Sequence, residues 1–295
     1  MSNKNVAVLG ATGAVGTEML KVLEKRNFPI KDLKLFASPS EKGTVIKFKG
    51  TSVKADVIDK DSFKGVDIAL SAVDSPIAKQ YAKQIVDSGA VMIDNSSAFR
   101  MDPEVPLVVP EVNADDIKKH KGIIANPNCS TIIMVVPLYP IYKLSRIKRV
   151  IVSTYQAASG AGAPAMTELI EQTRQVLDNK TVEKKVFPHR IAFNLFSHNT
   201  KIGENGYCEE EMKMVLETKK IMHDADILVA PTTIRVPILR AHSESINIEL
   251  EKKLDLNQIR DALKKAPGVK LVDDPEKNYF PMPIDATEQD DILVG

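Results

Sequence analysis

Tryptophan is absent from this chain of 295 residues, and cysteine occurs only twice, as Cys129 and Cys208. Two cysteines cannot build a disulfide framework, and no Cys/His spacing indicates a zinc site, so we expect no bound metal. The chain lacks both a membrane-length apolar run and a signal-peptide segment. The net charge of +1 gives no electrostatic reason to expect nucleic acid or a membrane surface as a partner. These absences favour a globular protein of a reducing, cytoplasmic compartment.

The first half of the chain alternates apolar runs with helical periods. Residues 5–9 are continuously apolar, which is typical of a parallel strand buried on both faces. Further strands are expected at 34–37, 66–72, 91–94 and 123–125, and helices at 17–26 and 77–88. This order predicts an α/β fold with a Rossmann-type, doubly wound parallel sheet.

The pattern changes after about residue 130. Strands are expected at 149–155, 226–230 and 245–250, with helices at 165–177 and 256–265. The last of these strands alternates in polarity and should have one solvated face. We therefore predict a dinucleotide-binding domain over 1–129, followed by an α+β catalytic and dimerisation domain with a mixed sheet over 130–295.

A glycine-rich loop separates the first predicted strand from the first predicted helix. Its spacing is G-x-x-G-x-x-G, with Thr12 where the usual dinucleotide fingerprint has its second glycine. Such a loop lets a pyrophosphate approach the backbone at a helix N-terminus. The predicted cofactor contacts here are Gly10, Thr12, Gly13, Ala14, Val15 and Gly16.

The loop after the second strand bears on the choice of cofactor. NAD-binding proteins place an Asp or Glu about 20 residues beyond the glycine motif. Here the loop contains Ser38, Ser40 and Lys42, which we predict to hold a 2′-phosphate and so to favour NADP. Glu41 would repel that phosphate if its side chain pointed inward.

Cys129 lies between a turn sequence, Asn126-Pro127-Asn128, and an apolar run at 132–136. This pattern puts the thiol at a helix N-terminus, where free backbone N–H groups and the helix dipole favour a thiolate. The alternative is a small buried hydrophobic residue. Cys208 precedes three glutamates, whose charges disfavour a thiolate, so we interpret it as structural.

Four further segments could supply polar groups to such a thiol. Gln156 ends a strand, and Glu210 and Lys213 share a helix face as either site residues or a solvated pair. Arg100 follows a strand of the parallel sheet, where loops line the ligand crevice. If residues 235–242 form an uninterrupted strand, Arg240 shares a face with His242 and Arg235 does not. Pro237 permits a bend, so either arginine could be the site residue.

Together these segments resemble the aspartate-semialdehyde dehydrogenase family over the whole chain. The matching segments are the glycine loop, Asn95-Ser96-Ser97-Ala98-Phe99-Arg100, Asn126-Pro127-Asn128-Cys129-Ser130-Thr131 and Tyr155-Gln156-Ala157-Ala158-Ser159-Gly160. The resemblance implies that Cys129 is the nucleophile, that Gln156 orients the acyl intermediate and that His242 is the acid/base. It assigns substrate or phosphate binding to Arg100, Asn128, Glu210, Lys213 and Arg235, and further cofactor contacts to Ser159 and Gly160.

The resemblance also implies the reaction. The Cys129 thiolate attacks aspartate semialdehyde while His242 takes the proton, hydride leaves for NADP⁺, and phosphate cleaves the resulting thioester to L-4-aspartyl phosphate. In the cell the family runs this reaction in reverse, with NADPH, toward lysine, threonine and methionine. Its members form homodimers or homotetramers.

Two departures from the family pattern stand out. Members usually carry an arginine where this chain has Ser40. Members also continue beyond Gly295, with a strand end and a terminal helix that packs near the nicotinamide. The alternatives are an enzyme similar to N-acetylglutamyl-phosphate reductase, whose motif has a glycine before the cysteine, and a nucleotide-binding fragment without turnover.

Overall fold

The computed structural model describes residues 3–295, and the chain divides into two compact units. The first unit contains the residues up to Val108 together with Ala114–Pro127. The second contains Val109–Asn113 and Asn128–Gly295. Each unit is described by itself.

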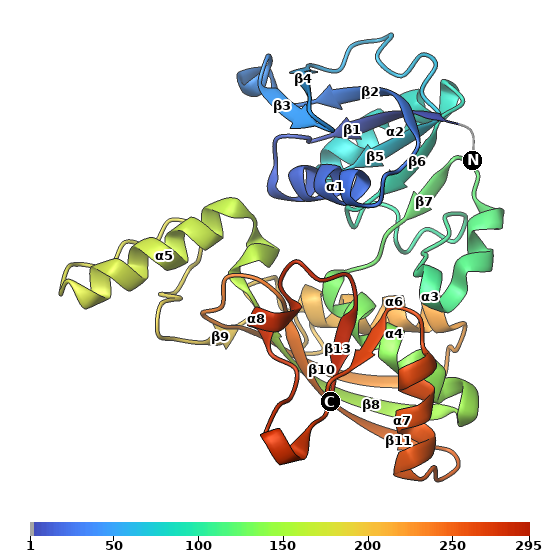
Figure 1. Ribbon diagram of the computed structural model, residues 1–295, viewed down its shortest axis with the longest axis vertical. Helices are drawn as coiled ribbons and strands as arrows, with labels where there is room; N and C mark the ends of the chain where they lie inside the picture. Colours follow the sequence, from blue (N-terminus) through green and yellow to red (C-terminus); the bar gives the residue numbers. More distant parts are fainter. Residues whose placement is uncertain (1–2) are drawn as a thin grey trace. The chain divides into compact units, whose positions relative to one another are not determined.

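The first unit is built on a seven-stranded sheet of order β3-β4-β2-β1-β5-β6-β7 (Figure 1). Its strands are β1 (Lys4–Leu9), β2 (Ile30–Phe36), β3 (Val45–Phe48), β4 (Thr51–Asp56), β5 (Ile68–Ser71), β6 (Val91–Asp94) and β7 (Ile123–Ala125). Its helical segments are α1 (Ala14–Lys25), η1 (Pro39–Glu41), α2 (Ser75–Asp87) and η2 (Ala114–Lys119). All pairings are parallel except β3 with β4. The predicted Rossmann-type sheet is confirmed.

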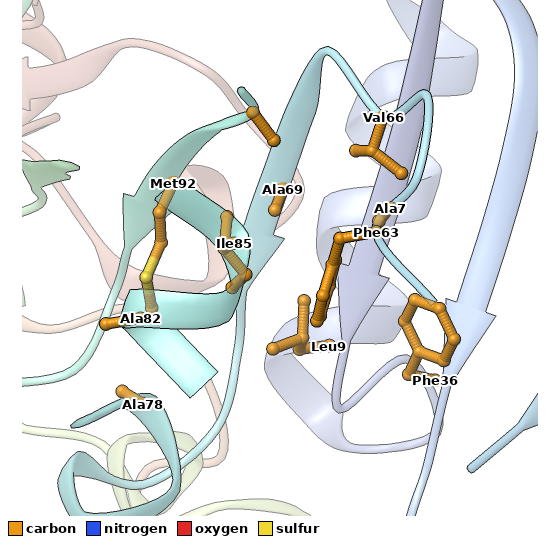
Figure 2. Packing of buried hydrophobic residues seen from close by; sticks show 11 residues of the cluster. Ala7, Leu9, Phe36, Phe63, Val66, Ala69, Ala78, Ala82, Ile85 and Met92 are labelled. Atoms are coloured by element: carbon orange, nitrogen blue, oxygen red, sulfur yellow. The ribbon is translucent and has the colours of Figure 1, made fainter. Parts of the chain in front are cut away.

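Strand β1 is buried on both faces, as its unbroken apolar sequence predicts. Ala7 and Leu9 belong to one core cluster, which includes Phe63, Ile85 and Met92 (Figure 2). Val6 and Val8 point to the opposite face, in a second cluster with Leu20. Because side chains alternate along a strand, an uninterrupted apolar run fits only a strand covered on both sides.

A β-hairpin, β3–β4, is absent from the elements that the sequence predicts. Its two-residue turn is Lys49-Gly50, and both residues have positive φ, 48° and 76°. Such turns favour Asn-Gly or Asp-Gly, so a lysine in the first position gives a weak signal. The hairpin extends the sheet beyond β2, next to the loop that starts at Ala37.

The second unit contains a mixed four-stranded sheet of order β11-β8-β10-β9. Its strands are β8 (Ile147–Gln156), β9 (Phe196–Ser197), β10 (Leu228–Arg235) and β11 (Ser243–Leu250), and a separate parallel pair is formed by β12 (Val269–Leu271) and β13 (Ile292–Val294). The helical segments are α3 (Pro110–Asn113), α4 (Cys129–Leu144), η3 (Ala158–Ala161), α5 (Ala163–Leu177), α6 (Glu209–Met222), α7 (Leu256–Lys265), η4 (Pro275–Lys277) and α8 (Pro283–Ala286).

Strands β8 and β10 run parallel, while β11 and β9 are antiparallel to their neighbours. The predicted mixed sheet is therefore confirmed, and β11 alternates in burial as expected. Strand β10 ends at Arg235, and residues 236–242 form no regular strand. Strand alternation therefore does not place Arg240 on one face with His242.

Candidate active site

Helix α4 begins at Cys129, with Asn128 as its N-cap. The Asn128 Oδ1 atom accepts hydrogen bonds from the backbone N–H groups of Ser130 (3.0 Å) and Thr131 (3.4 Å). The thiol is exposed, whereas the apolar residues that follow are largely buried. Cys129 therefore stands in the first turn of a capped helix, where the dipole stabilises negative charge.

A buried carboxylate, Glu210, connects the cap residue Asn128 to two other predicted residues, Gln156 and Lys213. Its Oε1 atom accepts from Asn128 Nδ2 (2.8 Å) and Gln156 Nε2 (3.1 Å), and its Oε2 atom accepts from Lys213 Nζ (3.0 Å). Burial alone would raise the pKa of Glu210, but the Lys213 ammonium and the Asn128 amide outweigh it and lower the pKa to about 2. The carboxylate is thus ionised at neutral pH. It holds Lys213 of the same helix close to Asn128 and Gln156.

Gln156 lies at the end of β8 and is 1% exposed. Its amide Nε2 also donates to Ser130 Oγ (3.0 Å), in the first turn of α4. Its Oε1 atom is buried and finds no hydrogen-bond partner among residues 3–295. A buried acceptor without a donor is costly, so this oxygen is suited to a donor group of a bound molecule.

Arg235 lies at the end of β10, parallel to the end of β8. One guanidinium nitrogen donates to the Ala157 carbonyl oxygen (2.8 Å), and another donates to His198 Nε2 (2.9 Å). The group also lies 5.6 Å from the centre of the Phe187 ring. Burial lowers the pKa of Arg235, while Glu210 and Cys129 interact with it electrostatically in the opposite sense. These contacts hold the Arg235 cation where it interacts electrostatically with the Cys129 thiol.

The same residue, Ala157, also orients His242, because its backbone N–H donates to His242 Nδ1 (3.0 Å). A backbone N–H can only donate, so the neutral ring carries its proton on Nε2. Burial, followed by the charge of Arg235, lowers the pKa of His242 to about 4. At neutral pH His242 is therefore an uncharged ring with an Nε2–H donor. A Cβ on Gly160 would lie 3.0 Å from His242 Nε2 and from an Arg235 guanidinium nitrogen, so a larger residue would require these side chains to shift.

In the first unit, the glycine loop has the features that a pyrophosphate site requires. Gly10 has φ of +71°, and a Cβ on Gly16 would lie 2.2 Å from the Gly10 carbonyl oxygen. Helix α1 can approach the loop this closely only because Gly16 has no side chain. Gly13 is the N-cap, and no acidic residue occupies the first turn of α1. The loop therefore fits a dinucleotide.

Arg100 also belongs to the first unit, in the segment after β6. It is buried, and its guanidinium donates to the carbonyl oxygens of Ser96 (3.0 Å) and Asn95 (2.9 Å). The amide of Asn126 donates to Asn95 Oδ1 (2.7 Å), which ties this segment to the chain that leads to α4. The role of Arg100 in phosphate binding stays a prediction.

Comparisons with known proteins show the family to which the chain belongs. The chain matches the family described as "Semialdehyde dehydrogenase, NAD binding domain" over residues 5–120 and "Semialdehyde dehydrogenase, dimerisation domain" over residues 138–295. It is 54% identical to an aspartate-semialdehyde dehydrogenase of Synechocystis sp. and 52% identical to one of Aquifex aeolicus, each over 98% of this chain and 86% of the relative. The chain belongs to the aspartate-semialdehyde dehydrogenase family.

A solved structure supports the same assignment. Aspartate semialdehyde dehydrogenase II of Vibrio cholerae, described as complexed with ASA, has a TM-score of 0.97 and 41% identity to this chain. The match covers 100% of this chain and 88% of that one. The aspartate-semialdehyde dehydrogenase assignment thus rests on sequence and fold together.

Three further residues that the sequence does not single out contact the candidate site or line a cavity with His242. Glu217 Oε2 accepts from the Asn128 backbone N–H at 2.6 Å, and its spacing of seven from Glu210 on α6 is a signal that could have found it. His198 accepts from Arg235, and burial lowers its pKa to about 4. Nothing local marks His198, because only the pairing of β9 with β10 brings it to Arg235.

Glu244 is the third of these residues, two positions after His242. Both residues line a cavity of about 600 Å³ in the second unit, together with apolar side chains of α4 and β11. Both carboxyl oxygens of Glu244 are buried and have no partner among residues 3–295, and burial raises the pKa of Glu244 well above its ordinary value.

By contrast, Arg240 is exposed, and Cys208 is the buried N-cap of α6. No group of three His, Cys, Asp or Glu side chains within the described part of the chain could hold a metal ion. Likewise, no helix between residues 3 and 295 is both long enough and apolar enough to span a bilayer.

Proposed function

We propose that this chain is a phosphorylating aldehyde dehydrogenase that interconverts L-4-aspartyl phosphate and L-aspartate 4-semialdehyde plus phosphate. Membership of the aspartate-semialdehyde dehydrogenase family gives the reaction class. The observation that carries the residue assignment is the start of α4 at Cys129, with Gln156, Arg235 and His242 in the same unit. The pathway toward lysine, threonine and methionine and a homodimeric or homotetrameric, cytoplasmic enzyme are part of the proposal.

In the reductive direction the Cys129 thiolate attacks the acyl carbon of aspartyl phosphate. A bond forms between the Cys129 sulfur and the acyl carbon, and the bond from that carbon to the phosphate oxygen breaks. Phosphate leaves with the bonding electron pair and exchanges protons with the solvent. Two groups support this step. The first turn of α4 stabilises the thiolate, and the Nε2–H of His242 donates to the developing oxyanion. The product on the protein is a thioester at Cys129.

The nicotinamide, when bound, supplies the hydride that reduces this thioester. The Nε2–H of His242 then donates a hydrogen bond to the same oxygen. Collapse of the thiohemiacetal releases the aldehyde and restores the Cys129 thiolate. His242 acts here as a hydrogen-bond donor through its Nε2–H group, and not as a base. The expectation that it takes the proton of the thiol requires the other tautomer, which the Ala157 N–H disfavours.

The other side chains bind and orient the substrate. We propose that Arg235 holds the α-carboxylate and that the unpartnered Oε1 of Gln156, together with Glu210, accepts hydrogen bonds from the substrate's ammonium group. Arg100, Asn128 and Lys213 are proposed to bind the phosphate. The glycine loop and Ser159 are proposed cofactor contacts, and the choice between NADP and NAD depends on the loop after β2.

The test is a steady-state assay with aspartate semialdehyde and an oxidised nicotinamide cofactor, with and without phosphate. We expect cofactor reduction that requires phosphate in wild type and is abolished in Cys129→Ala, with Cys208→Ala as the matched control that retains activity. Reduction with N-acetylglutamate semialdehyde instead would favour the related reductase. Cofactor binding without any turnover would show a nucleotide-binding protein and contradict the proposal.

A further inference from the structure

The loop after β2 directs a carboxylate toward the glycine loop. Glu41, the last residue of η1, accepts a hydrogen bond at Oε2 from the Thr12 hydroxyl (3.0 Å), in the middle of the glycine loop. The same oxygen accepts from the Ser38 hydroxyl (2.8 Å), at the start of the loop. Two hydroxyl donors from two segments therefore converge on one carboxylate oxygen, which fixes the direction of a side chain that the sequence leaves open.

This position matters because of how Rossmann-type sheets bind dinucleotides. The pyrophosphate lies on the glycine loop, and the adenosine ribose lies toward the end of the second strand. An acidic side chain there accepts the ribose 2′-hydroxyl of NAD, whereas an arginine accommodates the 2′-phosphate of NADP. Glu41 reaches from the segment after β2 to the glycine loop, so its carboxylate lies between the two parts that bind these groups.

The neighbouring cations are lysines that interact with Asp56, and none of them has the two parallel donors of a guanidinium group. Lys42 Nζ pairs with Asp56 Oδ1 at 3.2 Å, and Lys54, the other nearby cation, extends past Gly43 and also interacts with Asp56. The sequence contains no arginine between Arg26 and Arg100, so no arginine of β2 or its loop can grip a phosphate with two parallel hydrogen bonds. The Ser38 hydroxyl is donated to Glu41, and Ser38 and Ser40 are within 3.0 Å of each other.

We propose that Glu41 is the cofactor-specificity residue of this chain, and that it accepts the ribose 2′-hydroxyl of NAD(H) and disfavours the 2′-phosphate of NADP(H). This inference rests on the proposed function only in taking a nicotinamide dinucleotide as the cofactor. It replaces the expectation that Ser38, Ser40 and Lys42 select NADP. A second negative charge beside the carboxylate is repelled, and the phosphate would also have to displace the hydroxyl donors of Glu41.

Binding of nucleotides that lack the nicotinamide tests this without any turnover. Calorimetric titration of the full chain with ADP-ribose and with 2′-phospho-ADP-ribose should show at least about tenfold tighter binding of ADP-ribose to wild type. Glu41→Gln removes the charge and keeps a hydrogen-bonding side chain, so the ratio should fall by about tenfold. Asp87→Asn, an exposed charge change on α2, is the matched control and should leave the ratio unchanged.

A second variant tests the reverse preference. Ser40→Arg combined with Glu41→Ser supplies the missing fork and removes the repulsion, so 2′-phospho-ADP-ribose should become the tighter ligand. Equal or tighter binding of the phosphorylated nucleotide to wild type, with no effect of Glu41→Gln, would overturn the proposal and return the 2′-phosphate to Ser38, Ser40 and Lys42. Absence of turnover with either cofactor would contradict the proposed function but leave this binding preference standing.

Discussion

Replacing Glu210 with glutamine should destabilise the second unit in a strongly pH-dependent way. Glu210 is 4% exposed, and its pKa in the folded protein is about 2, compared with an ordinary value of 4.5. That difference corresponds to about 3 kcal/mol of stability at pH 7. Glu210→Gln cannot ionise, and its amide would face the Lys213 ammonium instead of pairing with it.

The sign of the pH dependence follows from the lowered pKa. The contribution of Glu210 is fully present above pH 4.5 and is lost as the pH falls from about 4.5 toward 2, because the unfolded chain then binds a proton that the folded one rejects. The difference between wild type and Glu210→Gln should therefore be about 3 kcal/mol at pH 7 and less than half of that at pH 3.

Urea unfolding at both pH values measures this difference. Glu209→Gln is the matched control, since Glu209 is in the same first turn of α6 but is exposed, and it should cost less than about 1 kcal/mol. If the two variants lose the same stability, or if the loss in Glu210→Gln is independent of pH, then Glu210 is not the ionised centre of this hydrogen-bond network.

Three other residues give further expectations. His242→Ala should lower kcat/KM by about 10²–10³, and His242→Gln, which still donates but cannot act as a base, should restore at least tenfold of that loss; equal losses would show that the ring acts as a base. His198→Leu should raise the KM for the substrate by about tenfold because Arg235 loses its acceptor, whereas His198→Gln should stay close to wild type; unchanged KM values in both would exclude this positioning role. Glu244 has a raised pKa, so the free energy of unfolding should fall by up to about 1.4 kcal/mol per pH unit above 4.5, and urea unfolding of Glu244→Gln should lack this slope.

Features governed by local sequence were predictable. The apolar run before Gly10 predicts a strand buried on both faces, and the turn sequence before Cys129 predicts the start of α4; both are confirmed. In both cases the signal lies within one turn or one strand of the residue concerned. The change from a parallel to a mixed sheet could likewise be read from the order of the elements.

Features governed by pairing between distant segments were not predictable. His198 meets Arg235 because a two-residue strand pairs with the end of β10, and the direction of Glu41 depends on Thr12, 29 positions away. The choice between Arg235 and Arg240 also depended on where β10 ends. Such contacts follow from tertiary structure, so neither residue composition nor periodicity encodes them visibly.

The proposed reaction requires Cys129 to carry the acyl group. Mass spectrometry of the protein mixed with aspartate semialdehyde and oxidised cofactor, in the absence of phosphate, measures this most directly. We predict an aspartyl thioester on Cys129, none on Cys208, and its disappearance on addition of phosphate. Turnover without a phosphate-sensitive adduct on Cys129, or an adduct on Cys208 alone, would contradict the assignment of Cys129 as the nucleophile.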